Sequence, residues 1–174
     1  YESRKETESV STLNFTIASG EFILICGPSG SGKSTIGRII NGLAPNFYRG
    51  ALTGKVLLDG IDITTIPQAE LAGSIGSVFQ NPRTQFFDTN STGELAFGCE
   101  NMGYPERKIK ERVHRASQEF GLENLLDRDI FNLSGGEKQK IACGSIYAVN
   151  PDVYVFDEPS SNLDFISINE LAEI

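Results

Sequence analysis

The sequence has few of the side chains that build metal centres and disulfides. It contains one histidine and three cysteines, Cys26, Cys99 and Cys143, which are widely spaced and form no C-x-x-C pair. These residues exclude a metal site of the His/Cys type, and the odd cysteine number is typical of a reduced, cytosolic protein. Cys26 and Cys143 lie in apolar surroundings and are predicted to be small core residues. His114 is predicted to face solvent from a helix over residues 109–120.

Long hydrophobic runs and an excess of positive charge are absent as well. The apolar runs are far shorter than the ~20 residues of a membrane-spanning helix, so the chain is predicted to be soluble by itself. Lysine and arginine number 15 against 23 aspartates and glutamates, which gives a net charge of −8. This balance argues against nucleic acid as a partner, because nucleic-acid surfaces gather lysine and arginine. With 174 residues and 39% hydrophobic content, one domain with a real core is expected.

The stretch CGPSGSGKST, residues 26–35, is the strongest local motif. An apolar run over residues 21–26 predicts a buried strand before it, and Ile36, Ile39, Ile40 and Leu43 recur at helical spacing after it. A glycine-rich turn from strand to helix directs backbone N–H groups inward and forms a cup for phosphate. The predicted nucleotide-binding residues are Gly27, Pro28, Ser29, Gly30, Ser31, Gly32, Lys33, Ser34 and Thr35.

Within this loop, Lys33 can reach the outer phosphates and the Ser34 hydroxyl can bind a bridging Mg²⁺. The alternative is a Gly/Ser-rich surface turn, which leaves the lysine and the flanking pattern unexplained. The loop therefore predicts a nucleoside triphosphate as ligand. Kinases, GTPases and transport motors share such a loop, so it does not name the activity.

Strand and helix signals alternate along the chain, and this predicts an α/β fold. Further strands are expected over residues 13–17, 55–60, 74–80 and 153–159, with mainly helical sequence between residues 81 and 144. A helix is expected to begin at Pro105 and to end at Gly121. The predicted organisation is a sheet-containing core interrupted by a helical insertion.

The strand that ends in VFDEP, residues 155–159, supplies two adjacent carboxylates. Asp157 is placed to hold Mg²⁺ through water, and Glu158 is placed to orient or deprotonate an attacking water. A pair of acids that simply face solvent at a strand end is the alternative. The phosphate loop in the same chain favours the catalytic interpretation.

The stretch NLSGGEKQK, residues 132–140, predicts a capped helix. Ser134 and Glu137 have the spacing of a capping box, and Asn150 with Pro151 ends the helix. Gly135 and Gly136 leave the first turn bare of side chains, which makes the helix start a second anion site. Taken alone, the segment would favour an ordinary capped helix.

Five segments together resemble the ATP-binding-cassette (ABC) ATPases. GPSGSGKST, FQNP, LSGGEKQ, VFDEP and SNLD occur in the order and approximate spacing of that family and span nearly the whole chain. The resemblance implies a P-loop NTPase core over residues 1–80 and 146–174, with a mixed or parallel sheet and an N-terminal antiparallel β region. It also implies a helical subdomain over residues 81–145 that carries the signature motif. ATP and Mg²⁺ are the implied cofactors.

The same resemblance assigns further roles. Gln80 resembles the lid glutamine, which contacts magnesium or the water, so the implied metal ligands are Ser34, Gln80 and Asp157 and the implied catalytic residues are Glu158, Lys33 and Gln80. Tyr1 lies where the family has an aromatic residue that stacks on adenine. Two such domains pair head to tail, so Ser134, Gly135, Gly136 and Glu137 of one would complete the γ-phosphate site of the other.

Longer stretches, NGLAPNFYRGALTGKVLLDG and FQNPRTQFFDTNSTGELAFGCENMG, resemble the energy-coupling-factor ATPases that power uptake of vitamins or transition-metal ions. The implied partners are a second ABC ATPase domain, a transmembrane coupling subunit that docks near residues 81–85, and a substrate-binding membrane subunit. The implied location is the cytoplasmic face of the cell membrane. A soluble ABC ATPase acting in translation or DNA repair is the alternative.

The family's switch histidine is expected about thirty residues beyond Asp164 and has no counterpart here. The chain is therefore expected to be C-terminally truncated and poorly active as an isolated fragment.

Overall fold

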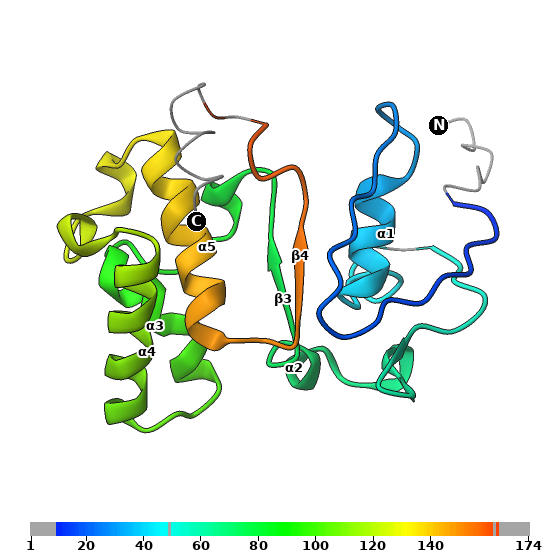
Figure 1. The fold of residues 1–174 in the computed structure, drawn as a ribbon, viewed down its shortest axis with the longest axis horizontal. Helices are drawn as coiled ribbons and strands as arrows, with labels where there is room; N and C mark the ends of the chain where they lie inside the picture. Colours follow the sequence, from blue (N-terminus) through cyan, green and yellow to red (C-terminus); the bar gives the residue numbers. More distant parts are fainter. Residues whose placement is uncertain (1–9, 49, 162, 164–174) are drawn as a thin grey trace, which may run out of the picture. The chain divides into compact units, whose positions relative to one another are not determined.

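The computed structural model describes residues 10–48, 50–161 and 163. The chain divides into two compact units, Tyr1–Thr65 and Ile66–Ile174. Figure 1 labels helix α1 of the first unit, and helices α2 to α5 and strands β3 and β4 of the second. Each unit has its own local structure, and the larger, second unit carries most of the regular elements. The predicted division into residues 1–80 with 146–174 and residues 81–145 stays a prediction.

The described residues of the first unit form one α-helix, one hairpin and one 3-10 helix. Helix α1 spans Lys33–Ile40, and strands β1 (Leu57–Leu58) and β2 (Ile61–Asp62) pair antiparallel before the 3-10 helix η1 (Ile63–Thr65). The turn between the strands has positive φ at Asp59 and Gly60, 51° and 82°, as a tight two-residue hairpin turn requires. The strand predicted over residues 55–60 is thus present, shortened, and forms the N-terminal antiparallel β region.

Two strand predictions in this unit are wrong. Residues 13–17 and 21–26 contain no strand, and their side chains are largely exposed, Phe22 at 87% and Leu24 at 75%. The alternating apolar pattern of residues 13–17 and the continuous one of residues 21–26 are both typical of strands. A strand forms, however, only where a neighbouring strand provides hydrogen-bond partners. Within the described part of the first unit, no such neighbour pairs with either segment.

The second unit contains a parallel pair of strands joined by a long helical crossover. Strand β3 (Ile75–Val78) pairs with β4 (Val153–Phe156), with Ile75 opposite Val153 and Val78 opposite Phe156. Parallel strands need a crossover connection, because the carboxyl end of the first strand and the amino end of the second lie at opposite edges of the sheet. Here all the helices between residues 82 and 149 provide it. Both strands lie where the sequence predicted them.

The crossover contains three long helices and short 3-10 turns of three residues each. The helices are α3 (Ser91–Asn101), α4 (Glu106–Glu119) and α5 (Gly135–Val149), and the short elements of this unit are α2 (Gln68–Leu71), η2 (Pro82–Thr84), η3 (Glu123–Leu125) and η4 (Ile130–Asn132). Helix α3 begins after Asn90, whose side-chain oxygen accepts the N–H groups of Thr92 and Gly93. Helix α4 begins after Pro105 and ends before Gly121, as predicted.

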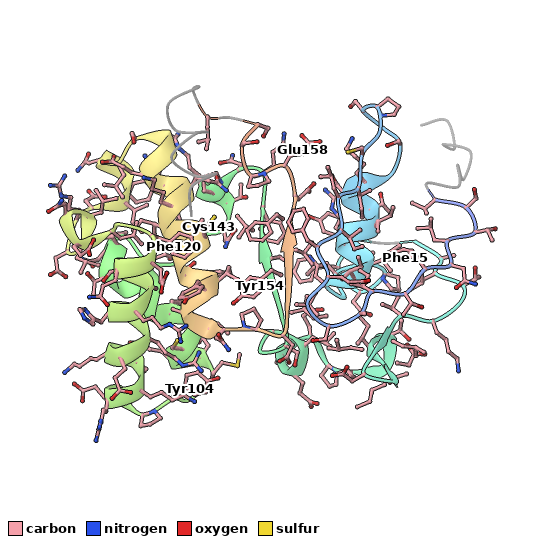
Figure 2. All side chains as sticks on the ribbon, viewed as in Figure 1. Phe15, Tyr104, Phe120, Cys143, Tyr154 and Glu158 are labelled. Atoms are coloured by element: carbon pink, nitrogen blue, oxygen red, sulfur yellow. The ribbon has the colours of Figure 1, made fainter. Side chains whose placement is uncertain are left out.

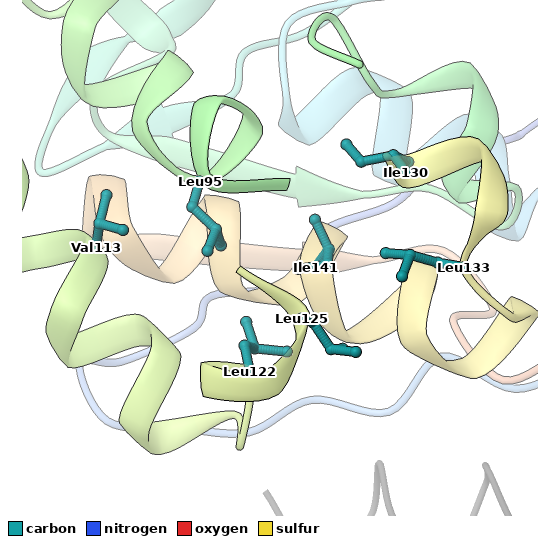
Figure 3. Packing of buried hydrophobic residues seen from close by; sticks show 7 residues of the cluster. All are labelled: Leu95, Val113, Leu122, Leu125, Ile130, Leu133 and Ile141. Carbon is teal, nitrogen blue, oxygen red and sulfur yellow. The ribbon is translucent and has the colours of Figure 1, made fainter. Parts of the chain in front are cut away.

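The three long helices form their own hydrophobic core. Figure 3 shows its central side chains, which come from α3, α4, α5 and the short turns between α4 and α5. The cluster consists of Leu95, Val113, Leu122, Leu125, Ile130, Leu133 and Ile141. A second group joins this layer to the sheet, since Val78 of β3 packs with Ala142 and Cys143 of α5. The helical layer is therefore attached to the strands through α5.

Strand β4 is less buried than predicted. Tyr154 and Phe156 are exposed at 39% and 50%, and alternate with the half-buried Val153 and Val155. Among the described strands, β4 pairs with β3 alone. A continuous apolar run is typical of a strand covered on both faces, but one paired edge and one covered face leave alternate side chains in solvent.

Leu95 is a position in the helical core whose truncation should destabilise the fold. Its side chain is fully buried, so Leu95→Ala should lower the free energy of unfolding by about 2–5 kcal/mol through lost burial and the remaining cavity. Leu57→Ala is the matched control, because Leu57 is 59% exposed and its truncation should cost less than about 1 kcal/mol. Chemical denaturation measures both. Equal effects would mean that Leu95 is not in a packed core.

Candidate nucleotide-binding site

The phosphate loop has the backbone of an anion cup. Gly30 and Gly32 adopt positive φ, 81° and 95°, which a side chain would oppose, and Ser31 N–H donates to the Pro28 carbonyl at 3.2 Å. Helix α1 starts directly after Gly32, and no side chain caps its first N–H groups. These groups and the positive end of the helix dipole thus lie together at the loop. Residues 27–35 all belong to this turn and the first turn of α1.

The Lys33 ammonium is folded over the same loop. Its Nζ donates to the carbonyl oxygens of Gly27 at 3.0 Å and Pro28 at 3.2 Å. Ser34 follows it in the first turn of α1. A cation, a hydroxyl and helix N–H groups around one turn form a donor set that fits a polyphosphate.

The second unit brings Gln80, Asp157 and Glu158 to one edge of the sheet. Gln80 follows β3 and the two acids follow β4, and the parallel register continues past the strands because Asp157 N–H donates to the Val78 carbonyl at 2.9 Å. Gln80 Nε2 lies 3.5 Å from Glu158 Oε2, a long hydrogen bond. The carboxyl ends of the adjacent parallel strands β3 and β4 thus place an amide and two carboxylates together.

Glu158 has an unusual backbone conformation. Its φ is +48°, in the left-handed region that non-glycine residues rarely occupy, and its carbonyl accepts the N–H of Ser161 at 3.1 Å. Figure 2 shows Glu158 beyond the end of β4, on the exposed turn. Strained residues of this kind are frequent at active sites, where the surrounding structure holds a functional side chain in place. This observation points to a functional role for the carboxylate.

The third group of predicted residues forms the start of α5. Ser134 Oγ accepts the Glu137 N–H at 3.2 Å, and Glu137 Oε2 accepts the Ser134 N–H at 2.7 Å, so the predicted capping box is present. The Ser134 backbone bond and then its side-chain bond hold the pKa of Glu137 below its usual range. Ser134 and Gly135 are exposed, so the helix N-terminus faces solvent. This geometry suits a helix start that receives an anion from outside its own unit.

The structure thus groups the predicted site residues in two sets. The loop over residues 27–35 belongs to the first unit, and Gln80, Asp157, Glu158 and residues 134–137 belong to the second. Tyr1, the predicted adenine contact, and Asp164 lie outside the described residues.

Gln85 is a residue that the sequence analysis did not single out. Its side-chain oxygen accepts the N–H of Phe79 at 3.1 Å, and so fixes the backbone that leads directly into Gln80. Gln85 is buried, and its Nε2 has no hydrogen-bond partner among the described residues. The sequence gives no sign of this contact, because a polar residue after an Asn-Pro turn is common. The contact forms only when the loop folds back onto the end of β3.

Glu94 is the second such residue. Its carboxylate is buried in α3 and accepts the N–H groups of Phe87 and Asp88 at 2.8 and 2.9 Å, and burial raises its pKa. It thereby orders the segment after η2. In the sequence, its only signal is a charged residue where the helix should face the core.

The cysteines and the histidine divide between core and surface. Cys99 and Cys143 are buried and unpaired, and burial raises the pKa of Cys143 to about 12. Cys26 is exposed, which corrects the predicted core position, because the segment before it is not a covered strand. His114 is exposed, as predicted. Among the described residues, no group of His, Cys, Asp or Glu could hold a metal ion by itself, and none of the helices is long and apolar enough to cross a membrane.

The order of these motifs agrees with a comparison against known families. The family described as ABC transporter matches residues 10–161, which includes the phosphate loop, Gln80, the capped start of α5 and both acids. The chain belongs to the ABC transporter family. Its α/β fold, with a phosphate loop, a parallel strand pair and a helical crossover, is that of the ABC ATP-binding domain.

Individual relatives give the same result. A Treponema denticola protein named for an ABC transporter ATP-binding role is 45% identical over the whole chain, which covers 35% of that relative. One from Methanosarcina acetivorans is 44% identical over 97% of the chain and 28% of the relative. The chain therefore spans about a third of the length of these curated relatives.

Among solved structures, the chain is similar to cbiO1 from Clostridium perfringens, part of the ABC transporter complex cbiONQ. The TM-score is 0.72 at 33% identity, and the match covers 84% of this chain and 57% of cbiO1.

Proposed function

We propose that this chain is the ATP-binding and ATP-hydrolysing part of a membrane importer of the energy-coupling-factor type. Membership of the ABC transporter family supports nucleotide hydrolysis coupled to transport. The likeness to cbiO1, whose complex is cbiONQ, supports the narrower assignment to uptake of a vitamin or a transition-metal ion. The observation that carries the proposal is the placement of Gln80 and Glu158 at one strand edge, in a chain that also has the phosphate loop.

In this proposal, the loop residues 27–35 hold the phosphates of ATP. The first N–H groups of α1 and the Lys33 ammonium neutralise negative charge, since both are directed at the turn. Ser34, Gln80 and Asp157 are the oxygen donors that would hold Mg²⁺, which prefers oxygen ligands. When bound, the ion neutralises charge on the phosphate oxygens.

Glu158 is the proposed general base. A carboxylate held by a strained turn and contacted by Gln80 is suited to orient a water molecule and accept its proton. Gln80 donates a hydrogen bond to this carboxylate. A displacement of the segment that follows Gln80 could therefore shift the Glu158 side chain. Gln85 acts as a positioning residue in this arrangement, because it fixes the N–H of Phe79 next to Gln80.

The exposed start of α5 indicates the first partner, a second ABC ATPase domain. Ser134 and the first N–H groups of α5 face solvent. An anion could therefore contact them without displacing the Ser134–Glu137 bonds of the capping box. A head-to-tail pair of domains would let residues 134–137 of one complete the phosphate site of the other. The second domain can belong to the same polypeptide or to another.

The segment after Gln80 is the proposed docking site for a transmembrane coupling subunit. Arg83 and Phe87 are exposed there, Phe87 at 75%, and the Phe87 ring stacks on Phe97 with centroids 4.7 Å apart. An exposed aromatic ring, supported by a half-buried one and close in sequence to a cation, suits the partly apolar surface of a protein partner. This docking would hold the domain at the cytoplasmic face of the membrane, next to a substrate-binding membrane subunit.

Co-purification tests this function. The full-length protein should be recovered from detergent extracts with a transmembrane partner, and Phe87→Ala should reduce that recovery severalfold without changing ATP affinity. Phe131→Ala is the matched control, because Phe131 is 71% exposed but lies in η4. Phe86 is unsuitable, since it packs against the helical core. Recovery with ribosomes or DNA instead would contradict transport and favour a soluble ABC ATPase.

A further inference from the structure

One face of α4 carries positive charges that form no ion pair with any carboxylate of the described residues. Two of the helix's five basic residues form exposed ion pairs one turn away, Arg107 with Glu111 and Lys110 with Glu106. Lys108, Arg112 and Arg115 follow the spacing i, i+4, i+7, so they share one face of the helix. Within the part of the chain that the structure describes, none of these three forms an ion pair. In a chain of net charge −8, this face is a local concentration of positive charge.

Aromatic rings hold these cations in place. Lys108 Nζ lies 3.7 Å from the centroid of the Tyr104 ring, and the Arg112 guanidinium carbon lies 4.8 Å from the same centroid. The Arg115 guanidinium carbon lies 5.5 Å from the centroid of Tyr147 in α5. A cation over a ring is stabilised without losing its charge. The contacts therefore order the three side chains and leave their charge available to a ligand.

Arg112 also fixes where this face meets α5. Its Nη1 donates to the carbonyls of Ala148 at 2.7 Å and Val149 at 2.6 Å, which are the last two residues of α5. These bonds satisfy carbonyls that a helix end leaves without partners, and the guanidinium covers the negative end of the helix dipole. The helix dipole places about half a negative elementary charge at the C-terminus of α5, whereas Lys108, Arg112 and Arg115 each carry a full positive charge.

A cavity lies at this junction. It has a volume of about 150 Å³ and is lined by Arg112, Arg115, Tyr147, Ala148 and Asn150. Two guanidinium groups, a phenol and an amide thus line one half-open pocket. A ligand that uses several of them at once needs several acceptor oxygens on one centre, which is the chemistry of a phosphate group.

We infer that the cavity between α4 and the end of α5 binds a phosphate group, with Arg115 as its principal charged contact. This site is separate from the proposed nucleotide site of the same unit. Residues 134–137 are at the opposite end of α5, and Figure 2 shows Tyr104 and Glu158 at opposite ends of the second unit. The phosphate is either free or part of an anionic lipid headgroup, since both present the same oxygens.

Titration with inorganic pyrophosphate tests the free form. The Lys33→Ala protein is used as background, because the phosphate loop would bind the same probe. In this background, calorimetry should still detect binding, and adding Arg115→Gln should weaken it by about tenfold or more through loss of a charge-assisted contact. Arg107→Gln is the matched control and should change affinity less than about twofold, because Arg107 is exposed and already paired with Glu111.

A flotation assay tests the lipid form. Vesicles containing phosphatidic acid should bind the same background protein more than vesicles of phosphatidylcholine alone, and Arg115→Gln but not Arg107→Gln should abolish the difference. Arg115 is exposed, so its substitution should leave the circular dichroism spectrum unchanged. An Arg115-dependent response in either assay supports the site and identifies the source of the phosphate. If both responses are absent, or if both variants weaken them equally, the inference is wrong.

Discussion

Glu158→Gln is expected to reduce ATP turnover of the full-length protein by about 10²–10⁴-fold, the usual contribution of a general base. The exchange keeps the shape of the side chain and an oxygen that can accept from Gln80 Nε2, now 3.5 Å from the carboxylate. It removes the proton acceptor alone. Affinity for Mg-ATP should remain within about threefold, because the phosphate contacts are assigned to the loop over residues 27–35.

Phosphate release and calorimetry measure the two quantities separately. Glu123→Gln is the matched control, since Glu123 is an exposed carboxylate in η3 of the same unit, and it should leave both quantities unchanged. Unchanged turnover in Glu158→Gln would remove Glu158 as the base. A matching loss of affinity would show instead that the carboxylate acts in binding.

The helices were predictable because their signals are local. The capping box at Ser134, the proline before α4 and the glycine after it act over one turn, and each helix boundary that depended on them was confirmed. The strands depend on partners distant in sequence. The strands over residues 75–78 and 153–156 pair with each other. Residues 13–17 and 21–26 also have apolar patterns typical of strands, but they are not paired in the described structure.

The candidate site follows the same distinction. The family resemblance placed Gln80 and Asp157 at one predicted Mg²⁺ site, whereas their position beside Glu158 depends on the pairing of β3 with β4, which the sequence did not show. Gln85 and Arg112 had no such signal, because each acts on a backbone group that only the folded chain brings near, Phe79 N–H in one case and the carbonyls of Ala148 and Val149 in the other. Side-chain contacts to backbone leave no periodic pattern in a sequence.

Lys33→Ala is expected to weaken ATP binding by about 1.5–3 kcal/mol, or roughly 10- to 150-fold, the usual contribution of a hydrogen bond to a charged group. Lys33 supplies the loop with its only full positive charge, and its bonds to the carbonyls of Gly27 and Pro28 already direct the ammonium over the turn. The same bonds must compete with the phosphates for the ammonium, which keeps the expected loss below that of a buried ion pair.

The fold should tolerate this substitution, because the two carbonyls that lose the ammonium belong to exposed residues and can bond to water. Lys55→Ala is the matched control: it removes the same charge from an exposed position of the first unit and should leave ATP affinity unchanged. Calorimetry with Mg-ATP decides between the two variants, and a melting curve verifies that both are folded. If Lys33→Ala binds ATP as tightly as Lys55→Ala does, the phosphate site is not at this loop. The proposed ATPase function would then lack the nucleotide-binding residues assigned to it.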